Sequence, residues 1–129
     1  MFAVSIKGVV FSPRGEAVLL LNERDEWELP GRRIELGESS VECLTKGILE
    51  ALELDVRVGA PLDTYLFEVS PGRHVFIATY RCALAGAFKP VLRTAGKRLG
   101  LFAPGALPPN LPRGYRASIA AATAERAAP

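Results

Sequence analysis

Runs of apolar, β-branched and aromatic residues predict the strands of this chain. The first two runs, at residues 4–11 and 17–21, flank the turn-forming sequence SPRG at 12–15 and predict an N-terminal hairpin. A second turn sequence, SPGR at 70–73, separates two longer runs and predicts a second hairpin. The predicted strands beyond the first hairpin are residues 55–58, 63–69, 74–84 and 99–102.

A helical pattern begins at Ser39, because Ser39 and Glu42 have the S-x-x-E spacing of a capping box. Apolar residues then recur at helical spacing and predict a buried stripe that ends near Glu53. The stripe consists of Val41, Leu44, Ile48 and Leu52. An alanine-rich segment at 115–126 predicts a second helix, after an irregular segment at 103–112 that is rich in proline and glycine.

The order of these elements predicts the fold class. Strands lie on both sides of one capped helix, and a second helix follows the last strand. This order is typical of an α/β (α+β) sandwich built on a mixed sheet. We expect residues 1–129 to form one domain, with a loop that begins around Leu29-Pro30-Gly31.

Composition places the chain among globular proteins, with 49% hydrophobic and 23% charged residues. The apolar N-terminal segment has no basic leader or cleavage site, so it predicts a strand in a cytoplasmic protein. No apolar run is long enough to span a bilayer. The two cysteines, Cys43 and Cys82, have neither the number nor the spacing of a disulfide framework or zinc site, and predict reduced, partly buried thiols.

Charge is unevenly distributed, although the net charge is only +2. Residues 23–63 carry eleven acidic and five basic side chains, whereas residues 64–129 carry two and nine. Such asymmetry suits a cation and a polyanion bound side by side, and ordinary surface charge explains it equally well.

The loop before the capped helix contains several glycines and glutamates. The segments WELPG at 27–31 and IELGES at 34–39 lead into a helix that carries Glu50. Glu38 also suits the first turn of a helix for purely electrostatic reasons. The whole arrangement resembles the signature of the Nudix hydrolase family (MutT-like), G-x5-E-x7-R-E-U-x-E-E-x-G-U, in which U is aliphatic. On this chain the signature spans residues 32–54.

The resemblance implies a Nudix-type α/β/α sandwich with a mixed curved β-sheet and two main helices. It also implies hydrolysis of a pyrophosphate bond in a nucleoside diphosphate linked to another moiety. In the family, signature glutamates bind divalent cations that bridge to the pyrophosphate while an activated water attacks phosphorus. Carried over by position, the resemblance implies Glu38 and Glu50 as catalytic residues, and Gly31 and Glu50 as ligands of Mg²⁺ or Mn²⁺. The basic residues Arg32, Arg33 and Lys46 are candidate substrate-binding residues, because the two loop arginines could contact phosphates, although solvated surface arginines explain Arg32 and Arg33 at least as well.

The chain departs from the signature where carboxylates matter most. Gly47 and Ala51 occupy two glutamate positions, and residues 93–98, where many members supply a further acid, contain none. A metal ion would therefore be weakly held, since Mg²⁺ keeps its waters unless carboxylates or phosphates hold it. Two hypotheses explain Gly47: neutral loss, or space for a bound ligand.

Three other signature positions differ. Lys46 replaces the arginine, which keeps the charge but loses the planar fork. Arg32 and Glu53 replace the two glycines. Helical geometry turns Glu42 and Glu53 away from the vacant positions, so neither easily refills them.

Two functions follow as hypotheses. The first is a Nudix-like, metal-dependent pyrophosphohydrolase whose activity is weak or lost. The second is an inactive Nudix domain that binds a nucleotide or another phosphorylated ligand as a sensor or interaction module. Nucleic acid is not an expected partner, because the basic residues are scattered and no recognition motif is present. The resemblance leaves a homodimer open, but no residue identifies an interface.

Overall fold

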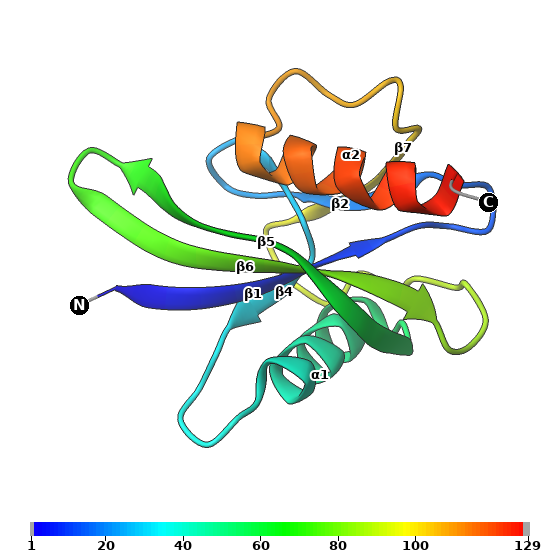
Figure 1. Ribbon diagram of the computed structural model, residues 1–129, viewed down its shortest axis with the longest axis horizontal. Helices are drawn as coiled ribbons and strands as arrows, with labels where there is room; N and C mark the ends of the chain where they lie inside the picture. The colour runs from blue at the N-terminus through cyan, green and yellow to red at the C-terminus, as the bar shows by residue number, and fades with distance from the viewer. Residues whose placement is uncertain (1, 128–129) are drawn as a thin grey trace.

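The computed structural model describes residues 2–127 as a layered α/β/α sandwich, with α1 on one side of the strands and α2 on the other (Figure 1). The predicted fold class is confirmed. The elements are β1 (Ala3–Val10), β2 (Ala17–Leu21), β3 (Trp27–Glu28), β4 (Gly31–Arg33), α1 (Ser40–Leu52), β5 (Val56–Ser70), β6 (Arg73–Leu84), β7 (Arg98–Phe102) and α2 (Arg113–Ala127).

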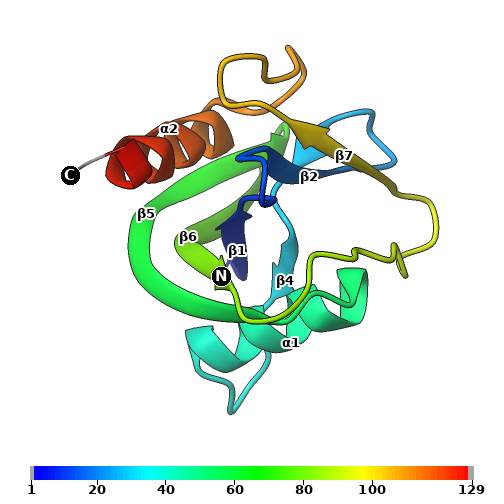
Figure 2. The same ribbon diagram turned by 90° about the vertical axis from the view of Figure 1, so that its right-hand side faces the viewer.

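The strands form two sheets. The larger sheet is mixed and has the order β4-β1-β6-β5, in which β1 runs parallel to β6 and the other neighbours are antiparallel. The smaller sheet is antiparallel, with the order β3-β2-β7. Strand β5 curves strongly, from the side of α1 to that of α2 (Figure 2).

The predicted N-terminal hairpin is wrong, because β1 and β2 belong to different sheets. They share only one isolated bridge, between Phe11 and Ala17 beside the turn. Residues 6–10 of β1 are all buried, so β1 is a central strand between β4 and β6. Both its edges are thereby occupied, and β2 pairs with β3 and β7 instead.

The predicted second hairpin is confirmed, since β5 and β6 pair in antiparallel register. The sequence predicts a break between residues 58 and 63, but β5 is one continuous strand. Register shifts between Val58 and Pro61 and between Pro61 and Asp63 absorb the residues that interrupt the apolar pattern. Such β-bulges bend a strand without ending it.

The short strands β3 and β4 replace part of a predicted loop. In β4, Gly31 pairs with Lys7 of β1 and has a φ of 142°. A Cβ at Gly31 would collide with the carbonyl oxygen of Ile6. Glycine is therefore needed where β4 approaches β1, and this approach sets the start of the following loop.

Both predicted helices are confirmed. The N–H of Glu42 donates to Ser39 Oγ over 3.1 Å, and the N–H of Ser39 donates to Glu42 Oε1 over 3.0 Å, which completes the capping box of α1. Glu53 caps the C-terminus in the left-handed conformation. The prediction that Val41 belongs to the buried stripe is wrong, because Val41 is 51% exposed. Cys43 is buried in its place, on the face of the helix that carries Leu44 and Ile48.

Two hydrophobic clusters fill the space between the layers. One joins α1 to the mixed sheet through Leu44, Ile48 and Leu52, and the other lies under α2 around Tyr115 and Ile119. Both cysteines are free, as predicted, and both are buried more completely than expected. Neither helix within residues 2–127 has the length and apolar character of a membrane span.

Candidate functional site

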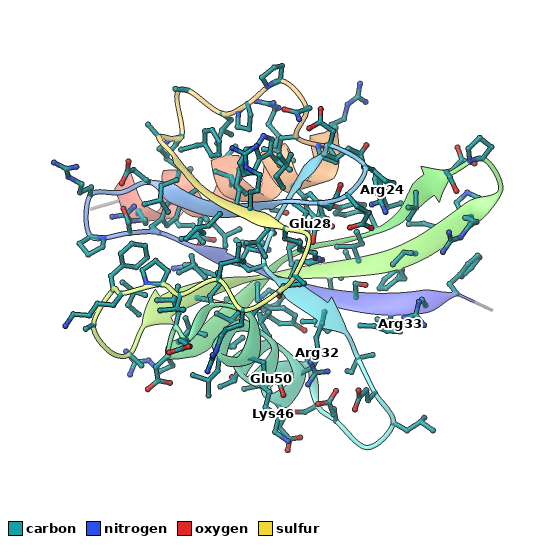
Figure 3. The ribbon with its side chains drawn as sticks, turned by 180° about the vertical axis from the view of Figure 1, so that it is seen from behind. Arg24, Glu28, Arg32, Arg33, Lys46 and Glu50 are labelled. Atoms are coloured by element: carbon teal, nitrogen blue, oxygen red, sulfur yellow. The ribbon has the colours of Figure 1, made fainter. Side chains whose placement is uncertain are left out.

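Arg32 connects three segments that are separate in the sequence. From β4, its Nη1 and Nη2 donate to Glu38 Oε1 and Oε2 over 2.9 and 2.8 Å. Its Nε lies 3.5 Å from Glu50 Oε1 on α1. Figure 3 shows Arg32 and Glu50 facing each other beside α1. The guanidinium thus lies between the two carboxylates that the family resemblance implies as catalytic residues.

The pair of Arg32 and Glu38 is well shielded at the carboxylate end, since the Glu38 side chain is only 13% exposed. Hydrogen bonds from Arg32, and then from the N–H of Glu35, lower the pKa of Glu38 to about 2. The same contact raises the pKa of Arg32. Both groups are therefore charged at neutral pH, and the bidentate geometry is that of a strong ion pair. Glu50 is a weaker partner, because its side chain is 68% exposed.

Gly47 lies directly beneath the Arg32 side chain. A Cβ built at Gly47 would lie 3.0 Å from Arg32 Cγ and 3.5 Å from Nε, closer than ordinary van der Waals contact to the carbon. One hypothesis proposed that the missing side chain makes room for a bound ligand. The group that occupies the room is Arg32.

A second charged cluster surrounds Glu28 at the end of β3. Lys97 Nζ donates to Glu28 Oε2 over 2.7 Å, and Lys7 Nζ lies 3.6 Å from the same oxygen. Asn22 Nδ2 donates to Glu28 Oε1 over 2.9 Å. Two lysines therefore share one carboxylate.

Burial and charge act against each other in this cluster. Burial lowers the pKa of Lys7, and the neighbouring Glu28 opposes that shift only in part. Burial alone would raise the pKa of Glu28, but the two lysines and Asn22 lower it overall. Lys7 is therefore a buried amine whose positive charge is only partly offset by the Glu28 carboxylate.

Lys7 and Glu28 line a cleft of about 210 Å³ between the sheet and the start of α2. Arg24 and Arg73 add two more positive charges to its wall, and Phe67 and Tyr115 add aromatic surface. No function was predicted for Lys7 from the sequence. Its available signal was a single lysine inside an apolar run that predicts a strand.

Several solved structures resemble this arrangement of layers. The MutT Nudix hydrolase from Burkholderia pseudomallei has a TM-score of 0.76 at 21% identity, covering 94% of this chain and 98% of that chain. The MutT protein from Methanosarcina mazei Go1 has a TM-score of 0.78 at 17% identity, covering 98% and 96%. The chain has a Nudix-type fold.

A third structure of this kind, an ADP-ribose pyrophosphatase from Streptococcus suis 89-1591, has a TM-score of 0.67 at 18% identity, covering 98% of this chain and 94% of that chain. No protein-family model matches the chain, and no curated protein matches it in sequence. The likeness is therefore one of fold.

The residues present do not fit the divalent cation that a Nudix-type fold implies. Within the part of the chain that the structure describes, no group of three or more His, Cys, Asp or Glu side chains could hold a metal ion. Both oxygens of Glu38 accept hydrogen bonds from Arg32, and Glu50 faces the same guanidinium. The assignment of Gly31 and Glu50 as metal ligands stays a prediction, against which this ion pair counts.

The other predicted substrate-binding residues do not gather around one site. Arg33 is exposed on β4, apart from the group formed by Arg32 and Glu50 (Figure 3). Lys46 is exposed on α1, beside Glu50. Their roles stay predictions, and neither residue lines the cleft of Lys7.

Proposed function

We propose that this Nudix-type domain binds a phosphorylated small molecule, with nucleotides as the candidate class, and does not hydrolyse it with a divalent cation. The observation that carries the proposal is the buried amine of Lys7, which shares the single carboxylate of Glu28 with Lys97. A phosphate oxygen would supply the negative charge that this cluster lacks.

The charge on the cleft wall supports an anionic ligand. Lys7, Arg24 and Arg73 line the cleft with one acidic residue, Glu28, which is already engaged by Lys97. Arg24 also forms ion pairs with Glu23 and Glu26, so Lys7 and Arg73 carry most of the excess positive charge. Charge-assisted hydrogen bonds to phosphate are stronger than neutral ones, and partial burial reduces their competition with water.

The dimensions support a ligand with a phosphate and an organic portion. The cleft of about 210 Å³ suits one or two phosphates, and ligand pockets usually measure about 300–1,000 Å³. A neighbouring hollow of about 350 Å³, lined by Asn110, Pro112 and Arg113, shares Phe67 with the cleft. The organic portion would lie in this hollow, past the Phe67 ring.

Weak metal-dependent hydrolysis is the alternative function. Glu38 and Glu50 favour it, since both are carboxylates at signature positions, and solved structures of the same fold include a MutT Nudix hydrolase. The ion pair with Arg32 counts against it, because a carboxylate engaged by a guanidinium is a poor metal ligand or base.

Ligand-dependent thermal shifts and calorimetry test the proposal. The probes are inorganic phosphate, pyrophosphate, nucleoside mono- and diphosphates and ADP-ribose, each with and without Mg²⁺. We expect at least one phosphorylated probe to stabilise the protein. Lys7→Met should weaken that binding at least tenfold, since loss of a charged hydrogen bond costs about 1.5–3 kcal/mol.

Lys89→Met is the matched control, because Lys89 is exposed and does not line the cleft. It should leave the affinity unchanged. The binding proposal would be wrong if no phosphorylated probe shifted the melting temperature, or if Lys7→Met bound as tightly as the native protein. Turnover with Mg²⁺ or Mn²⁺ that disappears in Glu50→Gln would establish the alternative.

A further inference from the structure

The cation that the carboxylates of this site hold is part of the chain. We propose that Arg32 is the resident cation of the site: its guanidinium takes the place of a divalent ion as the counter-ion of Glu38 and Glu50, and Gly47 provides the space that its side chain needs. This inference goes beyond ligand binding in the Lys7 cleft and does not depend on it.

The contacts give Arg32 the role of a bridging ion. Its two terminal nitrogens engage both oxygens of Glu38, and its Nε faces Glu50. These contacts tie β4, the loop after it and α1 together. A bidentate guanidinium is directional, however, so it holds the two carboxylates without an open coordination position for water or phosphate.

Arg32 and Gly47 are complementary in volume. The long side chain stands at a position where the signature has glycine, and glycine stands where the signature has glutamate. A Cβ at position 47 would lie 3.0 Å from Arg32 Cγ, so a glutamate there would displace the arginine or pair with it. Arg32 and Gly47 therefore depart from the signature as a pair, because the arginine needs the space that the glycine leaves.

If Arg32 is the counter-ion, restoring the two glutamates is not enough for metal binding, and Arg32 must be removed as well. In Gly47→Glu/Ala51→Glu, the new carboxylate at position 47 would lie beside the Arg32 guanidinium, which would neutralise it. We expect this double variant to bind Mn²⁺ as poorly as the native protein does. The triple variant, which adds Arg32→Gly, should bind Mn²⁺ at least tenfold more tightly than the double variant.

Calorimetry with Mn²⁺ alone makes the comparison, and circular dichroism confirms that each variant is folded. The matched control adds Arg33→Gly to the double variant, because Arg33 is the exposed neighbour of Arg32 on the same strand. It removes the same charge and should give no gain. Equal Mn²⁺ affinity of the double and triple variants would overturn the proposal, and so would an equal gain from the Arg33 control.

A second measurement needs no metal and uses smaller changes. Gly47→Ala should lower the melting temperature in the native background, because its Cβ meets a side chain held by Glu38. In an Arg32→Ala background the same change should raise the melting temperature, since alanine favours the helix. A rise in both backgrounds would show that Gly47 does not serve Arg32. If no phosphorylated probe bound to the Lys7 cleft, the Mn²⁺ and melting-temperature experiments would still test the role of Arg32. The ligand-binding proposal and the Arg32 proposal can therefore fail independently.

Discussion

The two charged clusters of this molecule have opposite balances. Around Arg32, one cation serves two carboxylates, Glu38 and Glu50. Around Glu28, two lysines share one carboxylate. The first cluster lies on the α1 side of β4, and the second lies where β1, β3 and the segment before β7 meet.

The difference shows how local charge balance decides what a site accepts. The Arg32 cluster already contains its cation, and its geometry is closed by bidentate hydrogen bonds. The Glu28 cluster contains more positive than negative charge, and part of it lines a cleft. We therefore propose that this chain combines a pair of carboxylates neutralised by its own Arg32 with a second cluster that binds an anion.

The largest expected effect comes from removing the shared carboxylate. Glu28→Gln leaves Lys7 and Lys97 without their acidic partner, in a place where Glu28 is only 9% exposed. Breaking a buried ion pair in this way destabilises a protein by about 3–5 kcal/mol. Urea unfolding measures the change in the free energy of unfolding.

Glu23→Gln is the control for that experiment, because Glu23 is exposed and forms only a surface ion pair with Arg24. We expect it to change the free energy of unfolding by less than about 1 kcal/mol. Similar effects of the two substitutions would show that the lysines of the Glu28 cluster do not depend on its carboxylate.

A smaller effect on the free energy of unfolding should appear at acidic pH. The pKa of Glu38 is about 2 in the folded protein and near 4.5 when unpaired, so its contribution is complete above pH 4.5. It is lost as the pH falls from 4.5 towards 2, because the unfolded chain binds the proton first. Native protein should therefore lose more stability over this range than Arg32→Ala, in which the folded pKa returns towards 4.5.

Urea unfolding at intervals between pH 5 and pH 2.5 measures this difference. Arg33→Ala provides the matched control, since it removes an exposed arginine from the same strand. Its pH dependence should follow the native protein. Identical pH dependence of native protein and Arg32→Ala would contradict the ion pair as the cause of the low pKa of Glu38.

The smallest effect is expected at the exposed end of the Arg32 cluster. Glu50→Gln removes a carboxylate that is 68% exposed and 3.5 Å from Arg32 Nε. Exposed ion pairs contribute about 0–1 kcal/mol, so the free energy of unfolding should change by less than about 1 kcal/mol. A larger loss in urea unfolding would make Glu50 an equal partner of Glu38 in holding Arg32.

Local patterns predicted the elements that depend on neighbouring residues. The capping box at Ser39 and Glu42 acts within one turn, so the start of α1 was readable from the sequence. The sequence did not indicate which strands pair with β1, because the turn at 12–15 is compatible both with a hairpin and with two strands in different sheets. Burial of β1 between β4 and β6 depends on residues more than twenty positions away.

The candidate site divides in the same way. By itself the sequence determined that Glu38 and Glu50 are present and that Gly47 and Ala51 are not carboxylates, because residue identity and helical periodicity suffice for that. Only the tertiary structure decided that Arg32 lies between the two glutamates and over Gly47. That placement requires β4 to pair with β1 and α1 to pack beside it.

The sharing of Glu28 by Lys7 and Lys97 likewise joins residues that are far apart in the chain, since Lys97 and Glu28 are separated by 69 positions. No local sequence pattern indicates that these three side chains come into contact. The sequence thus determined which charges the chain carries, and the packing of its strands and helix decided which of them neutralise one another. Electrostatic energy falls with distance, and folding alone sets the distances between remote charges.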